Sequence, residues 1–138
     1  MISNDEIKNI FIKPHVGAIA TISTTGEPSV RYVLMRMDCD MNILFATKND
    51  SIKIQQMNAN PKVNLTISST FEDTIEVNLK IAGSVEYIND DTRKKEFWLP
   101  FYTTFFSGPD DANYIIVKVI TENLEIMDQS EINKNLFL

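Results

Sequence analysis

Basic and hydroxyl side chains gather in one stretch of the sequence, at positions that suit phosphate binding. The stretch is expected to run as strand, tight turn, strand and helix start, and it holds Arg31, Arg36, Thr47, Ser51 and Lys53. A guanidinium group can bind a phosphate through two hydrogen bonds, and the start of a helix offers unpaired backbone N–H groups to an anion. The spacing therefore predicts an anion site.

The charge distribution indicates a small ligand. Residues 31 to 62 carry five basic and three acidic side chains, a net charge of +2, whereas the whole chain of 138 residues carries −6. A protein with a pI near 4.7 is poorly suited to nucleic acid or to an anionic membrane surface, because both require many basic side chains. We therefore expect a small anion and neither of those partners.

Arg31 and Arg36 are five residues apart, so on a straight strand they point to opposite faces. A bulge or twist could bring them together, or they could contact different parts of a ligand or different subunits. The alternative is that both arginines simply pair with surface carboxylates.

The hydrophobic pattern predicts about seven short strands and two or three peripheral helices in one domain, residues 1–138. The helices are expected at residues 1–13, 51–60 and 91–99, and the strands at 16–23, 30–37, 43–47, 62–69, 74–88, 114–121 and 124–127. Ser3 and Glu6 form a capping-box pattern, and Gly83 marks a bulge or bend inside a long strand. Short turns between strands favour a mainly β fold, a small antiparallel barrel.

Several motifs in order resemble the pyridoxamine 5′-phosphate oxidase family, from Val16 to about Asp128. That family has an Arg-x-Val-Leu-x-Lys strand, a Tyr-Thr pair, Ser-Arg-Lys at a helix start and Asn-Pro at the helix end. Here these are residues 31–36, Ala46-Thr47, residues 51–53 and Asn60-Pro61. Phe97-Trp98 and residues 106–114 resemble the general stress protein branch of the same superfamily.

The resemblance implies an antiparallel, Greek-key-like split β-barrel that binds FMN, with FAD as an alternative, at a homodimer interface. The positions that match the family's cofactor-binding residues are Arg31, Tyr32, Val33, Leu34, Arg36, Thr47, Ser51, Lys53 and Asn78. The basic residues and Ser51 would hold the phosphate and ribityl chain. Residues 32–34 and Thr47 would lie along the isoalloxazine, and Asn78 would bond its pyrimidine edge.

The chain departs from the family pattern at three positions and at its end. Ile52 replaces an arginine, Ala46 replaces a tyrosine, and Met127 replaces a tryptophan. The chain stops at Leu138 without the Arg-rich segment that binds substrate in true pyridoxamine phosphate oxidases. We therefore do not expect it to make pyridoxal phosphate.

The expected function is that of a general-stress-type flavin-dependent oxidoreductase acting on an unknown small molecule, with unassigned catalytic residues. Since no acid–base pair is evident, a non-catalytic flavin carrier or sensor is the alternative. A haem-binding barrel is a third possibility and would depend on His15, the only histidine.

Other residues receive structural interpretations. The rings from Phe97 to Phe106 are expected to pack a core or a dimer seam, or alternatively to line a pocket above the flavin. Cys39 is the only cysteine, so neither an internal disulfide nor a paired-cysteine metal site is expected. No apolar run has the length of a membrane span and no signal-peptide pattern occurs, which predicts a cytoplasmic protein.

Overall fold

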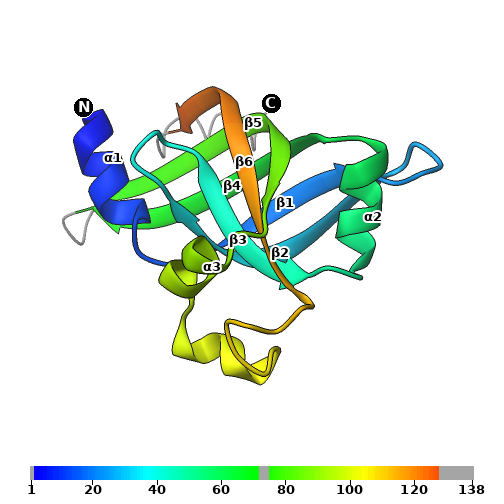
Figure 1. Cartoon of the computed structure of the whole chain (residues 1–138). Helices are drawn as coiled ribbons and strands as arrows, with labels where there is room; N and C mark the ends of the chain where they lie inside the picture. The colour runs from blue at the N-terminus through cyan, green and yellow to red at the C-terminus, as the bar shows by residue number, and fades with distance from the viewer. Residues whose placement is uncertain (1, 72–74, 128–138) are drawn as a thin grey trace.

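Six antiparallel strands form a closed barrel in the computed structural model, which describes residues 2–71 and 75–127. The strands are β1 (His15–Ile22), β2 (Pro28–Met37), β3 (Ile43–Lys48), β4 (Lys62–Phe71), β5 (Ile75–Ile88) and β6 (Tyr114–Met127). Their order around the barrel is β1-β2-β3-β6-β5-β4, and β4 pairs with β1 to close it (Figure 1). The prediction of a mainly β antiparallel barrel is confirmed.

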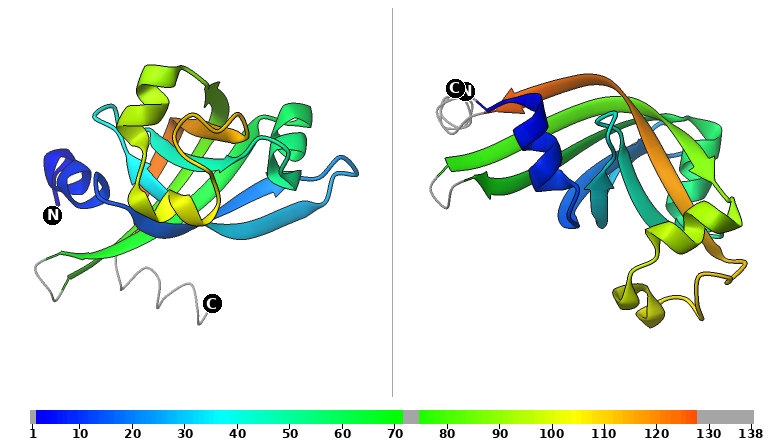
Figure 2. Two further views of the ribbon diagram at one scale, coloured as in Figure 1. Left: turned by 60° about the horizontal axis from the view of Figure 1, so that its bottom comes forward. Right: turned by 60° about the vertical axis from the view of Figure 1, so that its left-hand side comes forward.

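Three α-helices lie at the periphery of the barrel. They are α1 (Asn4–Phe11), α2 (Ile52–Ala59) and α3 (Asp91–Phe97), and a 3₁₀ turn, η1 (Pro100–Thr104), follows α3. Figures 1 and 2 show α1 and α2 at opposite ends of the barrel, with α3 and η1 on its outer side. Within the described residues, no helix is long and apolar enough to cross a bilayer.

Helix α1 begins with the predicted capping box. The backbone N–H of Glu6 donates to Ser3 Oγ at 3.1 Å, and the backbone N–H of Ser3 donates to Glu6 Oε1 at 3.2 Å. These bonds satisfy N–H groups that a helix start leaves without intrahelical partners. They fix the helix so that Ile7 and Phe11 are buried against the barrel.

The bulge predicted at Gly83 is present and lies between β5 and β6. Ala82 pairs with Asn123 and Gly83 with Thr121, so Glu122 is the additional residue on β6. A Cβ atom on Gly83 would lie 2.2 Å from the carbonyl oxygen of Ile120, which explains the glycine.

The prediction of two separate strands at residues 114–121 and 124–127 is wrong. Both belong to β6, because the bulge at Glu122 absorbs the break in the alternating pattern and pairing with β5 resumes after it. Over residues 2–71 and 75–127 the barrel therefore has six strands and not seven.

The described residues form two hydrophobic clusters. The larger one fills the barrel, where α1 contributes Ile7 and Phe11 and α2 contributes Ile54 and Met57. The smaller one lies outside the barrel, between β3, β5 and β6 and the chain from α3 onward. Its buried members are Ile88, Tyr102, Phe106, Tyr114 and Ile116. The smaller cluster fixes α3 and η1 beside the outer face of the sheet, and this position leaves a cavity between η1 and the sheet.

Candidate functional site

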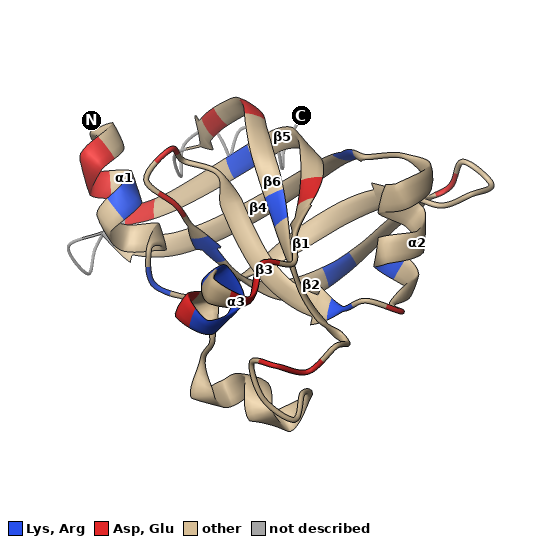
Figure 3. Cartoon of the chain, viewed as in Figure 1, with Lys and Arg blue, Asp and Glu red and all other residues tan. Residues whose placement is uncertain are grey.

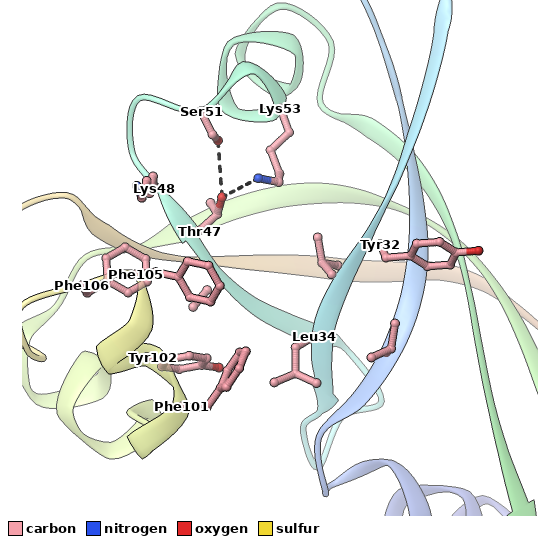
Figure 4. A pocket seen from close by; sticks show the side chains of 13 residues that line it. Tyr32, Leu34, Thr47, Lys48, Ser51, Lys53, Phe101, Tyr102, Phe105 and Phe106 are labelled. Atoms are coloured by element: carbon pink, nitrogen blue, oxygen red, sulfur yellow. Dashed lines mark hydrogen bonds between the residues drawn. The ribbon is translucent and has the colours of Figure 1, made fainter.

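A cavity of about 640 Å³ lies between the sheet and the segment that contains η1. The sheet contributes Val16, Tyr32, Val33, Leu34, Ala46, Thr47 and Lys48. The start of α2 contributes Ser51 and Lys53, and the opposite side carries Phe101, Tyr102, Phe105 and Phe106. Figure 4 shows Phe101 and Tyr102 on the side toward Leu34 and Phe105 and Phe106 nearer to Thr47, with Thr47, Ser51 and Lys53 together at one end. The cavity is thus apolar along its walls and basic at one end.

Six of the nine predicted cofactor residues line this cavity: Tyr32, Val33, Leu34, Thr47, Ser51 and Lys53. They come together because β2 and β3 are neighbours and α2 follows β3 after a short turn. The cavity lining does not include the other three, Arg31, Arg36 and Asn78.

The aromatic side of the cavity was foreseen only as one of two alternatives. Phe101 and Phe105 are more than half exposed and pack edge to face at 5.6 Å. Tyr102 and Phe106 are buried in the outer cluster, and each also lines the cavity. The segment therefore packs a core with two of its rings and leaves the other two facing open space.

Lys53 lies at the basic end of the cavity and donates from Nζ to Thr47 Oγ1 at 2.8 Å. Ser51 is the N-cap of α2, but its hydroxyl caps no backbone group and lies 3.4 Å from Thr47 Oγ1. The first turn of α2 contains no acidic residue. The positive end of the helix dipole therefore has no negative side chain on its own helix to offset it.

Arg31 lies behind this end of the cavity and is fixed by neutral oxygen atoms. Its guanidinium donates to Thr21 Oγ1 at 2.8 Å, to Ser29 Oγ at 2.9 Å and to Gln56 Oε1 at 2.9 Å. Thr21 and Gln56 are both buried and hydrogen-bonded to each other. Since Gln56 belongs to α2, this network joins the helix to β1 and β2.

The basic side chains at this end of the barrel, Arg31, Lys48 and Lys53, have no carboxylate partner among the described residues. Burial lowers the pKa of Lys53, and the nearby charge of Arg31 lowers it further. Burial also lowers the pKa of Arg31. Figure 3 shows basic segments of β2, β3 and α2 at this end, together with one acidic segment in the turn between β3 and α2. The arrangement favours an anion.

Arg36 points away from this basic end, and no bulge in β2 reunites the two arginines. β2 pairs with β1 and β3 in continuous register, so Arg31 and Arg36 lie on opposite faces of the strand. The Arg36 guanidinium donates to the carbonyl oxygen of Phe97 and lies over the Phe97 ring. The structure therefore has no bulge that brings the two arginines together, and neither of them pairs with a carboxylate among the described residues. Contact with different parts of a ligand, or with different subunits, stays a prediction.

Asn78 and His15 lie on other parts of the barrel. Asn78 accepts from Ser68 Oγ at 2.7 Å and donates from Nδ2 to the Met127 carbonyl at 3.3 Å. The ring nitrogens of His15 lie 2.8 Å from the Lys13 carbonyl and 2.9 Å from Ser69 Oγ. A metal bound to His15 would have to replace one of these bonds. Within residues 2–71 and 75–127, no cluster of three metal-ligating side chains occurs.

Comparison with known proteins identifies the relatives of this barrel. The sequence profile of the family described as "Pyridoxamine 5′-phosphate oxidase" matches residues 3–128. The chain belongs to this family. The resemblance proposed from the motifs is therefore confirmed, and flavin binding is typical of the family's members.

Relatives occur in both branches suggested by the motifs. General stress protein 26 of Bacillus subtilis is 26% identical over 116 residues, which are 84% of this chain and 81% of that protein. Pyridoxine/pyridoxamine 5′-phosphate oxidase of Alteromonas mediterranea is 31% identical over 99 residues, 72% of this chain. The match covers only 42% of that oxidase, so this chain corresponds to less than half of it.

Solved structures confirm the split-barrel fold. General Stress Protein 26 from Bacillus anthracis superposes with a TM-score of 0.76 at 21% identity, covering 90% of this chain and 96% of that one. A structure titled F420 Reductase gives a TM-score of 0.65 at 22% identity, covering 86% of this chain and 94% of that one. At these identities the likeness establishes the fold.

Proposed function

We propose that the protein binds FMN in this cavity and acts as a flavin-dependent oxidoreductase of the general stress protein type. The observation that carries the proposal is the pair Arg31 and Lys53, two cations without a carboxylate partner among the described residues, at a start of α2 that has no side-chain cap. A phosphate would neutralise both cations and accept hydrogen bonds from the helix start. The adjoining apolar cavity fits a flat ring system.

Each part of the cavity has a distinct role in this proposal. Lys53 and Ser51 would contact the phosphate directly, while Arg31 supports them through its charge and holds α2 in place through Gln56. Val33, Leu34 and the aromatic rings would enclose the isoalloxazine and exclude water. A bound flavin supplies the electron-transfer chemistry, so the protein has to bind, orient and shield it.

An oxidoreductase activity is supported by the family and by the structural neighbour titled F420 Reductase. The proposal is tested by flavin-binding and NAD(P)H-oxidation measurements on the purified protein. We expect FMN to bind with a visible flavin absorption band, and NAD(P)H oxidation in the presence of small acceptors to exceed the rate with free FMN. Protein that binds neither FMN nor FAD would refute the proposal.

A non-catalytic flavin carrier is the second candidate. The ionisable side chains that line the cavity are Tyr32, Lys48, Lys53 and Tyr102, with no carboxylate or histidine among them. A carrier needs no proton donor or acceptor beside its ligand. It would bind FMN tightly and show no turnover above free flavin with any acceptor, and this result would separate it from the enzyme.

We also propose that the protein forms a homodimer through the outer face of β1 and β2. Val16, Val30 and Tyr32 are each more than 60% exposed on this face, next to the cavity. A contiguous apolar strip of this kind marks an interface more often than a solvated surface.

The exposed free thiol of Cys39 suits a reducing compartment, so a cytoplasmic location is part of the same proposal.

A further inference from the structure

Arg36 joins strand β2 to the segment that carries the aromatic side of the cavity. Its guanidinium carbon lies 3.6 Å from the centre of the Phe97 ring, and the group donates to the Phe97 carbonyl oxygen. Its Nε is buried and has no hydrogen-bond partner among the described residues. In the described part of the chain, the positive charge is therefore held by a backbone carbonyl and an aromatic face, and not by a carboxylate.

The contact at Phe97 is continuous with the cavity wall. Phe97 ends α3 and precedes Trp98, whose ring packs edge to face against Tyr102 at 5.6 Å and against Tyr114 at 5.3 Å. Tyr102 lines the cavity. Burial raises the pKa of Tyr102, and the positive charge of Arg36 partly offsets this effect. Arg36 thus lies close to a ring that faces the ligand space.

We propose that Arg36 is a positioning residue that holds residues 97–106 against β2 and so sets the width of the cavity, without contacting the phosphate. This inference rests on the proposed function in one respect, namely that the ligand in the cavity is a flat ring system. Because stacking and dispersion contacts weaken steeply with separation, the position of the rings decides how well a flat ligand is held.

Two flavins that differ only in the phosphate test this role. A residue that binds the phosphate strengthens FMN but not riboflavin, so replacing it lowers the preference for FMN. Replacing a residue that sets the width of the cavity weakens both flavins equally. The variants are Arg36→Met, Arg36→Lys and Phe97→Leu, with Lys53→Met as the matched loss of a phosphate contact. Dissociation constants for FMN and riboflavin are measured on the full chain by quenching of flavin fluorescence.

A second readout needs no flavin. Trp98 is the only tryptophan of the chain, and its ring contacts Tyr102. Release of the segment would expose the indole and move its emission to longer wavelength. In Arg36→Met we expect this shift, together with weakening of both flavins by about the same tenfold factor. Arg36→Lys should show smaller changes in Trp98 emission and in flavin affinity than Arg36→Met, because lysine can still donate to the Phe97 carbonyl.

Two results would overturn the proposal. In the first, Arg36→Met or Arg36→Lys lowers the preference for FMN over riboflavin as Lys53→Met does, which would make Arg36 a phosphate ligand. In the second, Trp98 emission and both affinities stay as in the wild type. If Arg36→Met does not fold, Arg36→Lys and Phe97→Leu decide by the same criteria. If the wild type binds neither flavin, the proposed function fails, and the Trp98 emission of the variants still decides the role of Arg36.

Discussion

Lys53 combines a lowered pKa with a direct place in the cavity lining. Burial and the charge of Arg31 lower its pKa, so the protonated form is disfavoured in the folded, ligand-free protein. A bound phosphate would favour that form again. The same side chain should therefore affect stability and ligand binding with opposite dependence on pH.

Replacing Lys53 by Met should weaken FMN by about 10- to 100-fold and change riboflavin little, since hydrogen bonds to charged groups contribute about 1.5–3 kcal/mol. Wild-type affinity for FMN should fall as the pH rises through the lowered pKa of Lys53, because the neutral amine no longer attracts the phosphate. Titrations with both flavins from about pH 7 to about pH 10 measure this. An equal loss for FMN and riboflavin would contradict a phosphate contact.

The ligand-free protein should show the opposite trend. The unfolded chain binds more protons than the folded one between the lowered pKa of Lys53 and the ordinary lysine value, so stability rises with pH in that window. The difference in free energy of unfolding between wild type and Lys53→Met isolates the contribution of Lys53, because all other groups are common to the two proteins. Urea denaturation of both proteins across the window is the measurement. A difference that does not change with pH would mean that the pKa is not lowered.

The contacts that are local in sequence were predictable at the residue scale. Thr47, Ser51 and Lys53 lie within seven residues of one another, so a strand followed by a helix places them together. The surroundings of Arg36 were not predictable, because its partner is a backbone carbonyl 61 residues further along the chain. A carbonyl group carries no sequence signal.

At the scale of elements, the two serine N-caps differ in what they do. Ser3 accepts a hydrogen bond from the backbone of Glu6, whereas Ser51 accepts none from its helix. Ser3→Ala should therefore lower the free energy of unfolding by about 1 kcal/mol. Ser51→Ala should change stability much less and weaken FMN binding instead. Urea denaturation and FMN titration of both variants test this, and a larger stability loss in Ser51→Ala would show that its hydroxyl caps α2.

The bulge at Gly83 is the second element whose sequence signal has a measurable consequence. An alanine there places Cβ against the Ile120 carbonyl and the Val119 side chain, so Gly83→Ala should destabilise the barrel by about 3 kcal/mol. Gly108→Ala is the matched control, because a Cβ there meets nothing within 4 Å. Thermal or urea unfolding of both proteins provides the test. Equal stabilities would mean that β5 and β6 separate at little cost.

The same bulge marks where prediction of the elements succeeded and where it failed. The glycine inside an alternating strand indicated the irregularity correctly. The corresponding break in β6, at residues 122–123, looked like the end of a strand, because a sequence pattern does not distinguish a bulge from a turn when the partner strand is unknown.

The aromatic segment was ambiguous for a related reason. Its hydrophobicity predicts burial, but whether the rings cover a core or line a cavity depends on the distance to β2 and β3.

At the scale of the whole molecule, the outer face of β1 and β2 exposes large apolar side chains, so we expect another surface to cover it. Ala18 pairs with Tyr32 and Ala20 with Val30 across the two strands, so small and large apolar side chains alternate on one face. Tyr32 is 80% exposed and Val30 is 69% exposed. Ile52 is 70% exposed beside the proposed phosphate site. A second copy covering this face would also shield the mouth of the cavity, since Tyr32 belongs to both surfaces.

Val30→Glu should therefore disrupt the proposed homodimer, because a carboxylate on this face would be buried without a partner on both subunits. We expect the wild type to have about twice the mass of one chain by light scattering, and Val30→Glu to have the mass of one chain with an unchanged far-ultraviolet spectrum. Thr92→Glu adds the same charge at an exposed position of α3 and should leave the dimer intact. Val30 does not line the cavity, so weaker FMN binding in the monomeric variant would mean that the partner helps to enclose the ligand. A wild type that stays monomeric at high concentration would contradict the interface. The phosphate site at Lys53 is tested separately, by the titrations of Lys53→Met with FMN and riboflavin.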